Sequence, residues 1–397
     1  MTTTPLWRFP MRVLFATWPW RNHFNPMVPL GWALRAAGHE VVVACHPSFA
    51  RTITQAGLPA LPVGAEVDLD EVLRTAVRSS TWRPRPEGRS DAENPLKRRK
   101  GLTVLRVAAA SADAMADDAL RFARRWRPDL VVFEPMGFLG PLLGAALGVP
   151  ALRQLWTIDF LADIRLVQEE ILGPVAERLG IGAVDALGTA SIDPCPPRMQ
   201  APYDNRRIPA RYVPYNGPAV EPAWLREPPH RPRICVTWGT SAAGLDLGEA
   251  FLAPDVVRAL AGREVEVVVA VVSAQRELFG TPPANVVHLG PLPLDLVLPT
   301  CDALIHQGGG GTLMTAMKNA VPQFAIPYLP DATFNAGYVE GTGAGRTLFG
   351  GEASQQRLAA ELDTFLSNLD RYQAAADRLH AEHLALPSVA EMVGCLG

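Results

Sequence analysis

Short runs of β-branched and other apolar residues alternate with amphipathic stretches along the whole chain. The first half contains four such runs, at residues 12–17, 41–45, 130–133 and 151–155. The second half contains five, at residues 233–237, 266–272, 286–289, 303–305 and 323–326. Strands that alternate with helical stretches are typical of βαβ units, which build parallel sheets. We therefore predict an α/β protein with two Rossmann-like, doubly wound parallel sheets.

The clearest predicted helix follows the first strand. Its apolar residues recur at i, i+3 and i+4 spacing and share one face: Pro26, Met27, Leu30, Leu34 and Ala37. Gly38 is placed to end this helix, because glycine readily adopts the left-handed conformation that closes a helix. Another helix is expected to start near Leu313, and residues 355–386 are rich in helix formers.

A proline-rich segment separates the two sets of strands. Prolines recur within residues 215–222 and 228–232, and each one fixes φ and removes a backbone donor. We predict a first domain over 1–214, a linker over 215–232 and a second domain over 233–370, with C-terminal helices over 371–397 crossing back. Doubly wound sheets bind ligands at the carboxyl ends of their strands, so the site is expected in a cleft between the domains.

Composition limits the class of protein. The chain has 397 residues, 48% apolar and 19% charged, which is enough for two folded domains. A net charge of −3 gives no electrostatic reason to bind nucleic acid or an anionic membrane. The longest uncharged run, 136–152, is broken by prolines and glycines and is short for a membrane span, and no signal peptide is evident. The five cysteines form no CxxC pair, which favours the cytoplasm and argues against a zinc site.

A polar and strongly charged interval covers residues 75–101. We expect a solvated loop there. The alternative is a lid or a partner-binding segment, because long loops in compact domains are often functional.

Four consecutive glycines form the most distinctive motif. They stand in His306-Gln307-Gly308-Gly309-Gly310-Gly311-Thr312, between a buried strand and a helix. Without Cβ atoms, the backbone N–H groups of such a loop can approach a ligand closely. The loop also enters a helix N-terminus, where unpaired N–H groups and the helix dipole favour phosphate. The alternative interpretation is an ordinary flexible turn.

Several common enzyme motifs are absent from the sequence. No GxGxxG follows the first strand, and no GxxxxGK[ST], HExxH or GxSxG appears. These absences argue against dinucleotide-dependent hydride transfer, P-loop phosphoryl transfer, zinc proteolysis and serine hydrolysis.

His23 and Glu134 are the candidate catalytic pair. His23 lies on the loop that leaves the first strand, and Glu134 ends the strand at 130–133. An imidazole can take a proton from a hydroxyl near neutral pH, and a carboxylate commonly orients such a base. The alternative for His23 is a helix-capping or surface role.

Further polar residues follow the strands of the second half. Gly239, Thr240 and Ser241 come after its first strand, and Asp331 and Asn335 follow its last predicted strand. The first group suits a pyrophosphate, and the second suits sugar hydroxyls. Because the carboxyl ends of parallel strands meet at one edge of a sheet, we expect both groups near the glycine loop.

With these residues in place, the sequence resembles the family 1 glycosyltransferases of the GT-B fold. Residues 22–30 and 36–41 resemble the N-terminal signature that carries the catalytic histidine, here His23. Glu134 stands where many relatives carry Asp. The glycine loop resembles the His-Gly-Gly-x-Gly-Ser/Thr donor motif, with Gln307 at the place of the phosphate-binding histidine and His306 one residue earlier.

The resemblance also concerns the substrates. The family's Asp-Gln-x-x-Asn-Ala sugar motif appears here with Ala332 in place of Gln, which suggests a sugar with fewer hydroxyls, a deoxysugar. Residues 28–39, 126–135 and 213–217 are most similar to actinobacterial enzymes that transfer deoxysugars to macrolides, of the desosaminyl and mycaminosyl type. Several such relatives need a cytochrome-P450-like helper protein, so a helper is an expectation, and a homodimer is left open.

The expected function is inverting, metal-independent O-glycosylation of a polyketide-type natural product, in antibiotic biosynthesis, from a dTDP-deoxysugar as co-substrate. The donor would contact Gly239, Thr240, Ser241, Leu289, Pro291, His306, Gln307, Gly309, Gly310, Gly311, Thr312, Asp331 and Asn335. The acceptor pocket would be walled by Trp18, Trp20, Trp82, Phe138 and Trp156, with Phe160 as a further candidate. Two alternatives are a nucleotide-sugar epimerase and a catalytically silent relative that binds a nucleotide or stabilises a partner.

Overall fold

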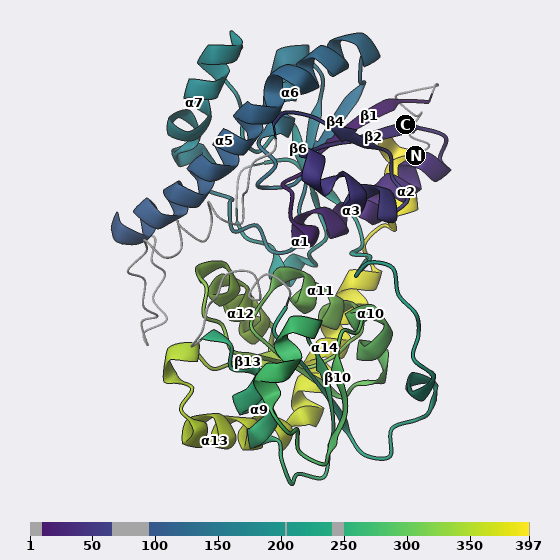
Figure 1. Cartoon of the computed structure of the whole chain (residues 1–397), viewed down its shortest axis with the longest axis vertical. Coiled ribbons are helices and arrows are strands. Elements are labelled where there is room, and N and C mark those ends of the chain that lie inside the picture. Colours follow the sequence, from purple (N-terminus) through teal and green to yellow (C-terminus); the bar gives the residue numbers. More distant parts are fainter. Residues whose placement is uncertain (1–9, 66–94, 203–204, 240–249, 397) are drawn as a thin grey trace.

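The computed structural model describes residues 10–65, 95–202, 205–239 and 250–396, which form two domains, one above the other in Figure 1. Each domain contains one parallel sheet. The first sheet has the order β3-β2-β1-β4-β5-β6-β7 and the second the order β10-β9-β8-β11-β12-β13. The expected architecture of two doubly wound parallel sheets is therefore confirmed.

The strands of the first sheet are short and mostly buried. Their bounds are β1 Arg12–Ala16, β2 Glu40–Cys45, β3 Ala60–Pro62, β4 Leu130–Phe133, β5 Ala151–Gln154, β6 Ala190–Asp193 and β7 Arg207–Pro209. Those of the second sheet are β8 Arg233–Thr237, β9 Glu266–Ala270, β10 Val286–Gly290, β11 Ala303–His306, β12 Gln323–Ala325 and β13 Gly345–Thr347. Every residue of β4 and β8 is buried, as expected where helices cover both faces of a parallel sheet.

All nine predicted strands are present, and four more were missed. The missed strands are β3, β6, β7 and β13, and each has only three or four residues. Unlike the equally short β4 and β11, they contain glycine, proline or polar residues and few β-branched ones, so they do not form apolar runs. Proline also ends β3 and β7, which is a residue that weakens a strand prediction.

Helices pack on both faces of each sheet. In the first domain they are α1 Arg21–Phe24, α2 Val28–Ala36, α3 Ala50–Gln55, α5 Pro95–Trp126, α6 Leu139–Leu147 and α7 Gln168–Leu179. The second half adds α9 Ala253–Ala259, α10 Leu294–Val297, α11 Gly310–Lys318, α12 Pro330–Thr342, α13 Gln355–Leu366, α14 Leu369–Leu384 and α15 Val389–Leu396. Short 3₁₀ turns are η1 Asn25–Met27, η2 Pro47–Phe49, η4 Ile164–Leu166, η5 Pro197–Met199, η6 Ala223–Arg226, η8 Ser273–Phe279, η9 Leu298–Thr300 and η10 Gly350–Glu352.

Two helix predictions and one loop prediction can be compared with these bounds. The helix after the first strand is present as α2, and Gly38 follows it with φ of +92°. The helix expected near Leu313 begins earlier, because Gly310 and Gly311 already form its first turn. The loop prediction for residues 75–101 is wrong from Pro95 onward, where α5 begins, and residues 75–94 lie outside the described ranges.

An apolar cluster joins the two domains. The first domain contributes Ile158, Cys195, Met199, Ala201 and Tyr212, and the second contributes Leu313, Met314, Met317, Val339, Ala344, Ala375, Ala376 and Leu379. One face of α11 therefore packs directly against the first domain. Burial of this continuous apolar surface favours the arrangement in which the carboxyl edges of the two sheets meet.

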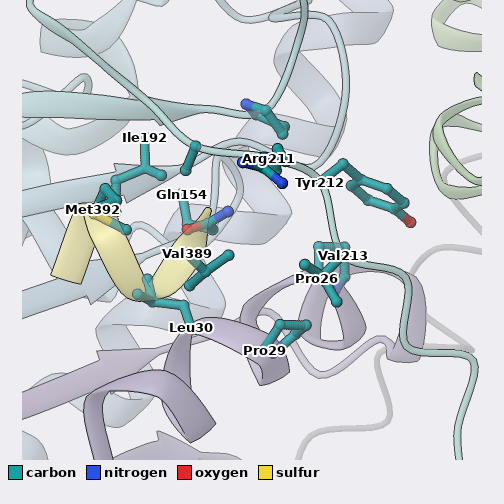
Figure 2. Close-up of a pocket in the computed structure, with 12 residues that line it drawn as sticks. Pro26, Pro29, Leu30, Gln154, Ile192, Arg211, Tyr212, Val213, Val389 and Met392 are labelled. Atoms are coloured by element: carbon teal, nitrogen blue, oxygen red, sulfur yellow. The ribbon is translucent and has the colours of Figure 1, made fainter. Parts of the chain in front are cut away.

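The last helix leaves the second domain and packs on the first. Met392 and Val393 of α15 are buried in the core that contains α2, whereas α14 packs on α11. Figure 2 shows Val389 and Met392 of α15 close to Pro29 and Leu30 of α2. Where the chain crosses, Arg211 donates from its backbone to the carbonyl of Pro387 and from its side chain to that of Leu386.

Within the described ranges, no helix has both the length and the apolar character that a bilayer-spanning segment requires.

Candidate active site

His23 and Glu134 form a buried pair at the carboxyl edge of the first sheet. His23 lies on α1, directly after β1, and Glu134 directly follows β4. The Nδ1 atom of His23 lies 3.0 Å from Oε2 of Glu134. The backbone N–H of Trp18 donates to Oε1 at 2.8 Å, and that of Met136 donates to Oε2 at 2.9 Å. These two bonds fix a carboxylate that has no solvent exposure.

This geometry assigns the tautomer of the histidine. A carboxylate that already receives two backbone N–H groups is an acceptor, so Nδ1 of His23 carries the proton and donates to Glu134. The Nε2 atom is then free to accept a proton from a substrate. His23 is 8% exposed, which leaves only a small opening for such a substrate. The arrangement is that of a general base with an orienting carboxylate.

Two tryptophans enclose the imidazole. The ring of Trp156 lies 4.3 Å from that of His23, centroid to centroid, with an interplanar angle of 49°. Trp20 meets the imidazole edge-on, at 5.7 Å. Both rings present aromatic surface to the side chain that would become a cation when it takes a proton.

The glycine loop ends β11 and enters α11, on the second domain. Gly309 occupies the N-cap position in an extended conformation, without a side-chain capping bond. The N–H groups of the first helical turn have no acceptor within the helix, so they are available to a phosphate oxygen. The Nε2 atom of Gln307 lies beside Gly239 and Gly309, at 2.4 and 2.8 Å from where their Cβ atoms would be. Glycine at both positions thus makes room for this amide, which can donate two hydrogen bonds.

The two other strand-end segments are placed at the same edge. Gly239 follows β8 with φ of +67°, and β10 ends at Gly290, between Leu289 and Pro291. Thr312 lies in the first turn of α11. The donor residues predicted from sequence lie at or after strand ends on this edge of the second sheet, apart from Thr240 and Ser241, which lie outside the described residues.

His306 and Asn335 differ from their predicted roles as donor contacts. His306 is fully buried, and its Nδ1 atom accepts the backbone N–H of Gly308 at 3.1 Å. Burial lowers the pKa of His306 to about 4, so this imidazole is neutral and lies beneath the loop. Asn335, 2% exposed, donates from Nδ2 to the carbonyl of Gly308 at 3.1 Å. Both side chains support the loop from inside the domain.

Asp331 lies in the first turn of α12 and faces the first domain. It has exposed surface, yet the surrounding protein desolvates its carboxyl group and raises its pKa, while the charge of His23 acts in the opposite direction. The neighbouring Ala332 is buried against Gly308.

Most predicted acceptor walls have no free surface. Trp18 and Phe138 are 3% and 1% exposed and belong to the core of the first domain, so their assignment to the acceptor pocket is wrong. Trp156 is also buried, between His23 and the second domain. Trp20 and Phe160 remain partly exposed, and Trp82 lies outside the described residues.

The sequence analysis missed two residues of the first domain that contact α11. Thr157 approaches Gly310, with its Cγ2 atom 2.7 Å from where a Cβ would be. The hydroxyl of Tyr212 donates to the carbonyl of Gly311 at 3.4 Å. Thr157 could have been noticed as a polar residue after a predicted strand, but Tyr212 has no local signal.

Among the described residues, no group of three or more His, Cys, Asp or Glu side chains is arranged to hold a metal ion.

Comparison with known proteins agrees with this geometry. Residues 32–239 match the domain family described as "Erythromycin biosynthesis protein CIII-like, N-terminal domain", and residues 255–397 match its C-terminal counterpart. The aklavinone 7-beta-L-rhodosaminyltransferase of Streptomyces galilaeus is 36% identical over 97% of this chain and 95% of its own length. The 3-alpha-mycarosylerythronolide B desosaminyl transferase of Saccharopolyspora erythraea is 34% identical, with 97% of each chain covered.

A solved structure gives the same result for the fold. The crystal structure of the glycosyltransferase VinC in complex with dTDP superposes with a TM-score of 0.81, at 32% identity, over 97% of this chain and 98% of that one. The expected GT-B fold is therefore confirmed, and the catalytically silent alternative is not favoured. The chain belongs to the erythromycin biosynthesis protein CIII-like family of glycosyltransferases.

Proposed function

We propose that this protein transfers a deoxysugar from a dTDP-sugar to a hydroxyl group of a polyketide-type aglycone, with inversion at the anomeric carbon. The observation that carries the proposal is the juxtaposition of the His23–Glu134 pair with the N-terminus of α11 at the domain boundary. One side supplies a base and the other supplies donors for a diphosphate. The relatives named as rhodosaminyl and desosaminyl transferases support the deoxysugar and the aglycone class.

On the acceptor side, the free Nε2 atom of His23 takes the proton of the attacking hydroxyl. The hydroxyl oxygen forms its bond to the anomeric carbon as the bond from that carbon to the diphosphate oxygen breaks. Glu134 keeps the imidazole in the required tautomer and stabilises the imidazolium that results. Attack on the face opposite the leaving group inverts the configuration.

On the donor side, negative charge builds on the departing diphosphate. The N–H groups of Gly310, Gly311 and Thr312 and the amide of Gln307 are placed to stabilise it. The thymine is proposed to lie against Leu289 and Pro291. Gln307 is neutral, so the helix N-terminus supplies most of the electrostatic stabilisation.

A thermal-shift titration of the purified protein with dTDP, UDP and GDP tests the donor site. At a concentration one hundred times its dissociation constant, dTDP should raise the Tm of the protein by about 3 °C or more. The rise in Tm with UDP or GDP should be smaller. His23→Ala should keep this stabilisation but lose nearly all transfer of sugar from a dTDP-deoxysugar. Equal transfer by His23→Ala and the wild type would contradict the proposal.

Four further proposals concern the protein as a whole. The domain limits at 214, 232 and 370 predict that limited proteolysis cuts within 215–232. The five free cysteines favour a reducing compartment, and we propose the cytoplasm. A cytochrome-P450-like helper is proposed from the resemblance alone, and the homodimer that the sequence leaves open is carried forward as a proposal. Transfer assays with and without such a helper, and the mass of the purified protein in solution, test these two.

A further inference from the structure

Trp156 touches both halves of the proposed site. It follows β5, and its indole ring lies on the imidazole of His23, at 4.3 Å between ring centroids. On its other side, its Cδ1 atom lies 3.2 Å from where a Cβ of Gly310 would be. Gly310 is the first residue of α11, whose N-terminus faces the diphosphate. Trp156 is only 9% exposed, so its side chain is packed between His23 and α11 and does not line an open pocket.

We infer that Trp156 is a positioning residue, which holds the imidazole of His23 at a fixed distance from the N-terminus of α11 and stabilises the imidazolium formed when the base takes a proton. The inference deepens the proposed function and rests on it, because it assigns a role to a residue at the same site.

The bond to Glu134 does not by itself fix the base. A single hydrogen bond at Nδ1 sets the position of the imidazole, but it leaves the plane of the ring free to tilt about that bond. The ring of Trp156, tilted by 49° to the imidazole and 4.3 Å from it between centroids, restricts this tilt. Trp20 meets the same imidazole only edge-on, at 81° and 5.7 Å between centroids. An indole face within 6 Å of a cation also attracts it, and the attraction is larger where water is excluded.

The identity of residue 310 fits this role. A Cβ there would meet Cγ2 of Thr157 at 2.7 Å and Cδ1 of Trp156 at 3.2 Å. Real Cβ atoms essentially never approach as closely as the first distance, so an alanine would push Thr157 and the indole aside. Gly341 provides a matched comparison, because it is also a helical glycine, in α12, and a Cβ there would meet nothing within 4 Å.

The experiment compares the full-length wild type with Trp156→Phe and Trp156→Leu, measuring kcat, both KM values and the pH dependence of kcat. Leucine should lower kcat by at least tenfold, and phenylalanine should restore most of the loss. The acid limb of the profile should move to lower pH by about 0.5 unit in Trp156→Leu, because the imidazolium has lost a favourable contact. Gly310→Ala should move the limb in the same direction, and the control Gly341→Ala, in α12 and away from the site, should leave it in place.

The imidazole titration of His23 can be followed by NMR without any turnover, with His23→Gln used to assign its signal. If the wild type neither binds dTDP nor transfers sugar, the proposed function fails, but the change of midpoint in Trp156→Leu still tests the contact. Two results would overturn the inference. A rise in acceptor KM alone would make Trp156 a wall of the acceptor pocket, and an unchanged acid limb with equal losses for phenylalanine and leucine would make it simple core packing.

Discussion

Replacing Glu134 by glutamine is the sharpest test of the catalytic pair. The carboxylate receives one N–H at Oε1, from Trp18, and two at Oε2, from Met136 and His23. A glutamine can present its single oxygen at only one of these places. If the glutamine oxygen takes the place of Oε2, it still accepts from Met136 and His23, and only the N–H of Trp18 faces the NH₂ group. In the reverse orientation two donors face the NH₂ group, so the first orientation is preferred.

The magnitude follows from this orientation. The histidine keeps its tautomer, but its cationic form then donates to a neutral amide oxygen and loses the charge-assisted bond to a carboxylate. Such bonds contribute about 1.5–3 kcal/mol, which corresponds to a loss of roughly 10- to 150-fold in kcat. The substitution also leaves the buried N–H of Trp18 without an acceptor. This should lower the free energy of unfolding by about 1–3 kcal/mol.

The assay is steady-state transfer from a dTDP-deoxysugar, together with dTDP binding and urea unfolding on the same preparations. Affinity for dTDP should stay within about threefold of wild type, because Glu134 belongs to the domain opposite the glycine loop. Glu170→Gln is the matched control, since Glu170 is 48% exposed and pairs only with exposed Arg106. A kcat for Glu134→Gln within threefold of wild type would refute the assignment of His23 as a base oriented by Glu134.

Three further predictions concern the loop, the buried histidines and the last helix. Gly308→Ala should weaken dTDP binding at least tenfold, because residue 308 has φ of +88° and a Cβ would lie 2.8 Å from the carbonyl of Ala332. The control Gly182→Ala, where a Cβ meets nothing within 4 Å, should bind dTDP as the wild type does. Burial lowers the pKa of His383 to about 4, so the neutral form stabilises the fold above pH 6.5. That stabilisation should be lost as pH falls towards 4, by about 1.4 kcal/mol per pH unit, and urea unfolding of His383→Gln should show a correspondingly flatter pH dependence. Met392 of α15 is 3% exposed, so Met392→Ala should lower the free energy of unfolding by about 2–5 kcal/mol in the same assay. A loss below about 0.5 kcal/mol would mean that α15 does not pack firmly on the first domain.

The sequence by itself determined the strands, the edge of each sheet and the residues that follow the strands. Period-2 and period-3.6 patterns are local, and parallel strands bring their carboxyl ends to one edge. His23, Glu134 and the glycine loop could therefore be placed at two facing edges before any coordinates were known. The short strands β3, β6, β7 and β13 could not, because their glycine, proline and polar residues leave no apolar run to mark a strand.

Only the tertiary structure decided which side chains face the site. In the sequence, an aromatic or polar residue that lines a binding site cannot be told from one that packs inside the domain. Trp18 and Asn335 were expected to contact substrates, and both are buried in the structure. The contacts that decide this join residues far apart in the chain, such as Trp156 with Gly310 and Tyr212 with Gly311. They depend on how two domains pack, which is a property of complementary surfaces rather than of local periodicity.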